Sequence, residues 1–152
     1  MKTIEQEIKQ KKFPNIYLKS DINILFTAGW LQGNSMRMFK KYGLSQQQYN
    51  VLRILRGQHP KPVSVTQIVE RMIDKMSNAT RLVEKLKQKD LVTREMSAKS
   101  RRQVDINITE SGLSLLKIID KEMNAKNPPL HYENVTTEEL EQLNFILDKI
   151  RN

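Results

Sequence analysis

Basic and hydrogen-bonding side chains gather on one side of the helical pattern that runs from Asp74 to Lys89. They are Lys75, Ser77, Asn78, Arg81 and Lys85. Apolar residues recur at helical spacing on the other side, at Ala79, Leu82, Val83 and Leu86. Such a helix offers one face to a hydrophobic core and the other face to an anion.

The side chains on the polar face suit the base edges and phosphates of duplex DNA. Serine and asparagine both donate and accept hydrogen bonds, and the guanidinium of Arg81 can grip a guanine edge or a phosphate. Lys75 and Lys85 are better suited to phosphates, because an ammonium group lacks the planar geometry of a guanidinium. Two alternatives stay open: the Thr80 hydroxyl either reaches DNA or bonds back to the helix backbone, and Arg81 is either a DNA contact or a solvated residue.

The neighbouring segments predict the scaffold that positions this helix. A shorter helical pattern covers residues 65–72, and a turn around Ile73 separates the two helices. The segment Leu91–Met96 and the alternating segment Val104–Ile108 predict a hairpin. Two helices joined by a short turn and followed by a two-stranded hairpin are typical of a winged helix-turn-helix. The predicted fold class is therefore mainly α with a small β-hairpin wing.

Short capping signatures predict where the helices begin. Ser64 and Gln67 form a capping box at the first helix of the helix-turn-helix, and we expect Asp74 to cap the second by accepting from a nearby backbone N–H. Ser20 is expected to cap a long helix from Asp21 to about Tyr42. The same reasoning predicts caps for three further helices at Ser45, Thr109 and Thr136.

Several motifs occur in order between about Leu44 and Leu116. They are Ser77-Asn-Ala-Thr-Arg-Leu-Val-Glu-Lys-Leu86, Asp90-Leu-Val92, Arg101-Arg102 and Thr109-Glu-Ser-Gly112. In these motifs the sequence resembles the MarR family of winged-helix transcription regulators. The resemblance implies a dimeric, sequence-specific, ligand-responsive protein whose partner is double-stranded DNA.

The resemblance also implies that an arginine of the wing enters the minor groove. Arg101 and Arg102 precede the second strand, and we expect one of the pair to stabilise the base of the wing instead. Ser97 and Ser100 occupy positions where the family usually has acidic residues, so we expect a more basic and looser wing. The six-residue tip, 97–102, has no apolar anchor beyond Ala98 and is expected to be mobile without a ligand. The candidate DNA-contacting residues are Ser64, Lys75, Ser77, Asn78, Thr80, Arg81, Lys85, Lys99, Arg101 and Arg102.

The resemblance divides the chain into two parts within a single MarR-like domain, residues 1–152. Residues 44–116 form the DNA-binding winged helix-turn-helix, and residues 1–43 and 117–152 form a helical dimerisation part. The flanking helices carry apolar stripes that need a partner, and the resemblance implies that this partner is the same region of a second chain. The alternative is that they fold back on their own wing domain.

Charge and composition agree with a polyanion as the partner. The 152 residues have a formal net charge of +9, with 10 basic and 3 acidic side chains in residues 1–60, 11 and 5 in 61–102, and 5 and 9 in 103–152. No long apolar run accompanies this charge, which favours nucleic acid over a membrane; a surface charged only to prevent aggregation is the alternative. The chain has no cysteine and no signal peptide at its N-terminus, so we expect a cytoplasmic protein without thiolate chemistry.

No motif predicts catalysis, a metal or a cofactor. His59 and His131 stand alone, without a second ligand at metal-binding spacing, and are interpreted as surface residues. The sequence has no glycine-rich phosphate loop and no hydrolase or metalloprotease motif. We therefore do not expect an enzyme.

The resemblance further implies a small aromatic or phenolic effector, bound between the dimerisation helices and the wing domain. The side chains that could line such a pocket are Trp30, Met36, Met38 and Tyr49, with Arg53 or Arg56 for charge. The alternative is that these aromatic and methionine residues fill a core.

Together these inferences predict a homodimeric repressor whose two recognition helices enter successive major grooves of a pseudo-palindromic operator. The alternative is a winged-helix module for protein interaction, without sequence-specific DNA binding.

Overall fold

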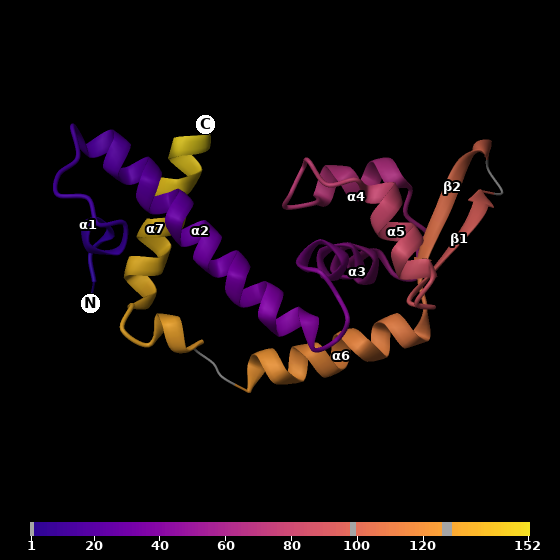
Figure 1. Ribbon diagram of the computed structural model, residues 1–152. Helices are drawn as coiled ribbons and strands as arrows, with labels where there is room; N and C mark the ends of the chain where they lie inside the picture. The colour runs from indigo at the N-terminus through magenta and orange to yellow at the C-terminus, as the bar shows by residue number, and fades with distance from the viewer. Residues whose placement is uncertain (1, 98–99, 126–128) are drawn as a thin grey trace.

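In the computed structural model the described residues are 2–97, 100–125 and 129–152, and of residues 100–102 only the backbone is described. The helices are α1 (Ile4–Glu7), α2 (Ile16–Lys40), α3 (Gln46–Gln58), α4 (Val65–Arg71), α5 (Ala79–Lys87), α6 (Glu110–Asn124), the 3-10 helix η1 (Leu130–Tyr132) and α7 (Thr137–Arg151), and the strands are β1 (Val92–Ser97) and β2 (Ser100–Ile108). Figure 1 shows two lobes: α3, α4, α5 and the hairpin form one, and α1, the start of α2 and α7 form the other. The end of α2 and the long α6 run between them.

The first lobe, which we call the winged lobe, is built around one hydrophobic core. Its fully buried side chains come from α3, α4, α5, β2, α6 and the segment before α4. They include Val51, Leu52, Leu55, Val63, Ile68, Val83, Leu86, Ile106, Leu116 and Ile119. Of the four apolar residues that the helical spacing predicted on this face of α5, Ala79, Val83 and Leu86 are buried, and Leu82 is partly buried against the core. This core holds α5 against α3 and α4 and leaves its opposite face open to solvent.

The four serine and threonine caps predicted at Ser45, Ser64, Thr109 and Thr136 are confirmed, since each side chain accepts a hydrogen bond from the first turn of its helix. The cap expected at Asp74 is wrong. Helix α5 begins only at Ala79, and its cap is Asn78, whose Oδ1 accepts from the N–H of Arg81 at 3.0 Å. Residues 72–78 thus form a longer turn than the sequence predicted.

The wing is an antiparallel hairpin in which Val92 pairs with Ile108 and Met96 pairs with Val104. A further bridge joins Val63 to Ile106, so the segment before α4 extends the sheet. The six-residue tip expected over 97–102 is wrong, because β2 begins at Ser100, which pairs with Ser97.

A glycine fits the start of α6 closely against the hairpin. A Cβ at Gly112 would lie 2.4 Å from the carbonyl oxygen of Leu91 and 2.7 Å from Cγ1 of Ile108. The Thr109 hydroxyl donates to the Asp90 carbonyl at 2.7 Å, and the N–H of Gly112 donates to this hydroxyl. Any side chain at position 112 would push α6 away from the wing.

The long helix α2 begins earlier than predicted. Asn15 is its cap and accepts from the N–H of Leu18 at 2.9 Å, whereas Ser20 lies inside the helix and its Oγ donates to the Ile16 carbonyl. Gly43, with φ +65°, turns the chain after the helix. The correction moves the start of α2 from Asp21 to Ile16, which adds more than a turn of helix to the second lobe.

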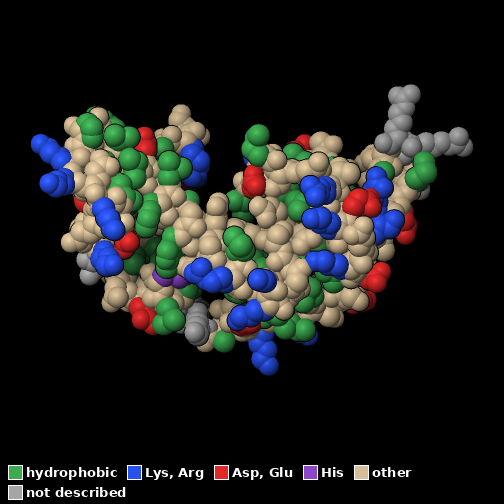
Figure 2. Space-filling view, viewed as in Figure 1, with side chains coloured by type: hydrophobic (Ala, Val, Ile, Leu, Met, Phe, Trp, Pro, Cys, Tyr) green, Lys and Arg blue, Asp and Glu red, His purple; other side chains and the backbone are tan. Residues whose placement is uncertain are grey.

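Apolar side chains of this second lobe lie in solvent. Helix α7 has no buried residue, and its stripe is exposed at Leu143 (48%), Ile146 (52%) and Ile150 (58%). On α2 the exposed apolar residues are Ile16, Tyr17, Leu18, Leu25, Phe26, Trp30 and Met36. Figure 2 shows hydrophobic side chains along this lobe. Among the described residues no helix has the length and apolar character needed to cross a membrane.

Candidate nucleic-acid interface

The turn between α4 and α5 is held by its own polar side chains. The carboxylate of Asp74 accepts from the N–H of Met76 at 3.0 Å and from the hydroxyl of Ser77 at 2.7 Å. These hydrogen bonds, first that of Ser77 and then that of Met76, lower the pKa of Asp74 below its usual value. Asp74 therefore orders the turn that precedes α5, a different role from the cap that the sequence predicted.

Two of the candidate DNA contacts are engaged within this turn and at the end of α4. The ammonium of Lys75 donates to the carbonyls of Val69 at 3.3 Å and Glu70 at 2.5 Å, at the negative end of α4. Ser77 is half-buried and donates to Asp74. Both residues stabilise the approach to α5, a structural role that the sequence pattern did not distinguish from DNA contact.

Three other candidates lie open on the first two turns of α5. Thr80, Arg81 and Lys85 are all exposed. Within the described part of the chain, the Thr80 hydroxyl makes no hydrogen bond to the helix backbone, so it is available to an outside partner. Asn78 is exposed too, and its cap bond uses the carbonyl oxygen and leaves the amide group to face solvent.

An ion pair that the sequence did not predict joins the wing to α5. Oε1 of Glu84, a buried atom, lies 3.1 Å from Nη1 of Arg94 on β1. The contact lacks hydrogen-bond geometry, so the attraction is mainly coulombic. It couples the orientation of the wing to the helix that carries Arg81.

The wing tip carries three of the candidate DNA contacts, Lys99, Arg101 and Arg102. Lys99 lies outside the described residues, and so do the side chains of Arg101 and Arg102, although their backbones lie in β2. Ser97, at the end of β1, is buried. The expectation of a looser wing therefore stays a prediction.

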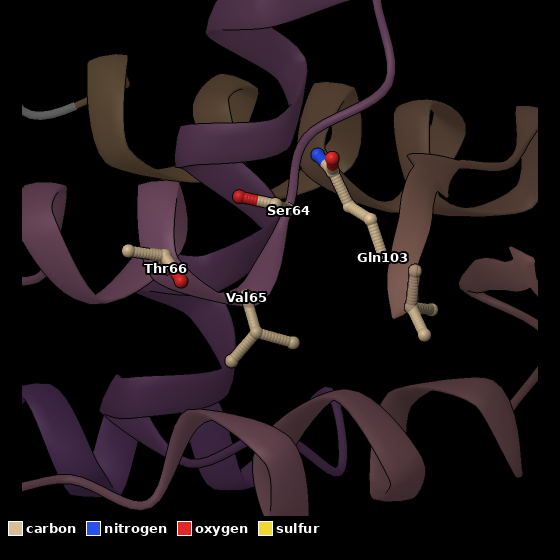
Figure 3. Close-up of a pocket in the computed structure, with 5 residues that line it drawn as sticks. Ser64, Val65, Thr66 and Gln103 are labelled. Carbon is tan, nitrogen blue, oxygen red and sulfur yellow. The ribbon is translucent and has the colours of Figure 1, made fainter. Parts of the chain in front are cut away.

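A shallow depression of about 400 Å³ lies between the start of α4 and β2. Figure 3 shows residues that line it, Ser64, Val65 and Thr66 at the start of α4 and Gln103 on β2. Ser64 is at the same time the cap of α4, accepting from the N–H of Gln67 at 3.2 Å. Gln103, which follows Arg101 and Arg102 in β2, was not among the predicted site residues because it has no distinguishing spacing.

Three candidates for an effector pocket, Tyr49, Arg53 and Arg56, form contacts within the protein. Tyr49 stacks on Phe39 with 4.2 Å between ring centroids, and its hydroxyl accepts from Arg53 at 3.0 Å. Arg56 Nη1 lies 2.6 Å from Oδ2 of Asp120 on α6, and Arg53 lies 3.5 Å from the same carboxylate. These contacts brace α3 against α6.

The remaining pocket candidates lie apart from that brace. Trp30 is exposed on α2 and meets the ring of His131 edge to face at 5.5 Å. Met36 is exposed, and Met38 packs at the edge of the core. The sequence reasoning thus grouped side chains that the structure divides between two places.

A second polar contact ties α2 to α6. The hydroxyl of Tyr42 and the ammonium of Lys41, the latter at 2.7 Å, both donate to the carboxylate of Glu122. The hydrogen bond to this carboxylate raises the pKa of Tyr42 above its usual value. Both lobes are thereby joined through α6.

Within the described ranges no cluster of three or more His, Asp or Glu side chains could hold a metal ion. His59 and His131 are both exposed, as expected. The structure thus places the solvent-facing start of α5 beside the wing. Lys and Arg side chains lie over this winged lobe, as Figure 2 shows.

The sequence is similar to those of known proteins. A family model described as the MarR family matches residues 42–103. The chain is 28% identical over 116 residues, 76% of each protein, to the HTH-type transcriptional regulator MgrA of Staphylococcus aureus. It is 33% identical over 97 residues, 62% of this chain and 61% of the other, to the HTH-type transcriptional repressor MdtR of Bacillus subtilis.

Solved structures agree in fold. A putative MarR-like regulator of Bacillus cereus matches with a TM-score of 0.71 and 25% identity, over 85% of this chain and 91% of the other. A MarR transcription factor of Planctomyces limnophilus matches with a TM-score of 0.68 and 27% identity, over 90% of this chain and 98% of the other. Over residues 42–103 in sequence, and over most of its length in fold, the chain is similar to MarR-family winged-helix proteins, and these matches support a DNA-binding transcription regulator.

Proposed function

We propose that the protein is a homodimeric repressor that binds a pseudo-palindromic operator and releases it when a small aromatic or phenolic effector binds. The observation that carries this proposal is the pairing of two surfaces in one chain. One is the exposed start of α5, with Thr80, Arg81 and Lys85. The other is the exposed apolar face of α2 and α7, which a single chain leaves uncovered.

A second copy of the chain is the occupant that best fits the apolar face. Leucine, isoleucine and aromatic side chains recur along both helices, and burying them against the same surface of another copy removes them from water. A dimer also places two α5 helices on one duplex, and two helices read more base pairs than one. We therefore assign residues 44–116 to DNA binding and the flanking residues 1–43 and 117–152 to dimerisation.

The DNA contacts that we propose are of two kinds. Thr80, Arg81 and the amide of Asn78 face base edges, and Lys85 and the wing residues Lys99, Arg101 and Arg102 face phosphates or the minor groove. Ser64 contributes through the start of α4, Lys75 through its contact with the end of α4, and Ser77 through the turn that precedes α5. The protein acts in the cytoplasm, where its DNA is.

Repression and response to an effector are the finer parts of the proposal. The relative MdtR carries the word repressor in its name. Helix α6 joins the lobes through Asp120 and Glu122, so a ligand that loosened these contacts would change the spacing of the two α5 helices.

The test is selection of bound duplexes from a random pool by the full-length protein, with the mass of the free and bound protein measured by light scattering. Enrichment of an inverted repeat by a dimer supports the proposal. Recovery of no motif, with equal binding to every duplex, would instead indicate a winged-helix module directed at a protein partner.

A further inference from the structure

The five side chains from Asp74 to Asn78 differ in what they do. Four are engaged in holding the start of α5: Asp74 accepts from the turn, Ser77 donates to Asp74, Lys75 donates to the end of α4, and Asn78 caps α5. The fifth, Met76, has its backbone N–H fixed by Asp74 at 3.0 Å, but its side chain is 94% exposed. The turn is thus an ordered frame from which one apolar side chain projects.

The position of Met76 places it beside the helix start that enters DNA. It lies two residues before the cap of α5 and five before Arg81, and the N-terminal residues of a recognition helix contact base edges in the major groove. The charge around it favours DNA as the partner, since residues 61–102 carry 11 basic and 5 acidic side chains.

The major groove offers one apolar group to such a side chain. Thymine alone presents a methyl group there, whereas the other base edges present hydrogen-bond donors and acceptors. A methionine thioether is flexible and polarisable, so it can settle against that methyl without a fixed geometry. A polar residue at this position would have no such preference.

We propose that Met76 is a specificity-determining residue that reads the C5-methyl group of a thymine in each half of the operator. This inference rests on the proposed function, because it requires a specific duplex. It adds an apolar base contact to those proposed for Asn78, Thr80 and Arg81. This contact comes from a turn whose polar neighbours Lys75 and Ser77 are engaged within the protein.

The experiment replaces each thymine of the selected operator in turn by deoxyuridine, which removes only the methyl group. Affinities of the full-length protein are measured for wild type, Met76→Ala and Ile73→Ala. Ile73 is the matched control, because it is an apolar residue of the same turn that is 81% exposed and lies farther from the start of α5. Circular dichroism of all three checks that the fold is retained, as expected for exposed side chains.

For wild type, replacing one symmetry-related pair of thymines by deoxyuridine should lower the affinity about fourfold per half-site. This is the effect of losing one methyl contact. Met76→Ala should bind the thymine and uracil duplexes equally at that pair, and Ile73→Ala should keep the wild-type ratio. If Met76→Ala shows the same thymine-to-uracil ratio as wild type at every position, the inference is overturned. Failure to select any operator would contradict the proposed function itself, so the two failures are distinct.

Discussion

Glu84 on α5 lies 3.1 Å from Arg94 on β1, and this ion pair joins the wing to the helix that we propose as the DNA-reading element. The two residues lie in different elements, yet both are partly shielded from solvent. The contact means that the wing does not hang freely from the core. Its orientation depends on the same helix that carries Thr80 and Arg81.

This coupling predicts non-additive effects on DNA binding. Glu84→Gln and Arg94→Gln should each lower operator affinity several-fold. Because each change breaks the same contact, the double variant should lose about as much affinity as the single variant with the larger loss. A double-mutant cycle by fluorescence anisotropy measures the coupling. Glu95→Gln, at an exposed neighbour on β1, is the control and should not couple to Arg94→Gln. Simple additivity of the Glu84 and Arg94 changes would show that the wing is oriented by other contacts.

The cap at Asn78 predicts a separation of stability from base recognition. Asn78→Ala should lower the free energy of unfolding by about 1 kcal/mol, since α5 loses its cap. Asn78→Asp keeps the oxygen that accepts from Arg81 but loses the amide donor, so it should melt like wild type and yet show a weaker preference for the selected operator. Thermal unfolding and competition binding give the two readouts. An unchanged preference in Asn78→Asp would limit this residue to capping.

Local signals explain which helix starts were predictable. Ser45 and Ser64 each have a glutamine three residues later, and both capping boxes form because every partner lies within one turn. Asp74 failed as a cap because its carboxylate makes a tight turn with Met76 and Ser77, which competes with helix initiation. Ser20 failed because Asn15 is an equally good cap five residues earlier. A choice between two good caps depends on tertiary packing, which the local sequence does not contain.

The contacts across the fold were the part that the sequence could not predict. Helical spacing identified Ala79, Val83 and Leu86 as core, since one buried face imposes a period. No period links Arg56 to Asp120, so the pairing that braces α3 against α6 was read instead as charge available to a ligand. The sequence therefore identified positions on α5 that the structure leaves exposed, but not the internal hydrogen bonds of Lys75 and Ser77, and contact of these residues with DNA stays a prediction.

The basic wing predicts a salt-dependent contribution to binding. Arg101→Ala should weaken operator binding by about 1 to 3 kcal/mol and reduce the slope of log affinity against log salt by roughly one, since each lost phosphate contact releases one counterion fewer. Titrations at several salt concentrations measure the slope. Lys117→Ala, which removes one charge from an exposed position on α6, is the control. The same affinity and slope in Arg101→Ala would remove this arginine from the interface.

The apolar face of α7 predicts that a single charge disrupts the dimer. Leu143→Asp should shift the protein toward monomer, because the carboxylate would be buried without a partner in the interface. Asn144→Asp adds the same charge to the next residue of the helix and should leave the dimer intact. Light scattering across a range of protein concentrations distinguishes them. Equal behaviour of the two variants would place the dimer interface elsewhere.

The most direct test of base recognition by α5 is the specificity ratio of wild type and Arg81→Ala, measured as affinity for the selected operator against scrambled duplex at two salt concentrations. Wild type should show a ratio of at least about a thousand at both. Arg81→Ala should lose about tenfold or more of that ratio, since one base contact is worth roughly 1 to 3 kcal/mol. A wild-type ratio near one, or a ratio that Arg81→Ala leaves unchanged, would contradict the assignment of α5 as the helix that reads the operator.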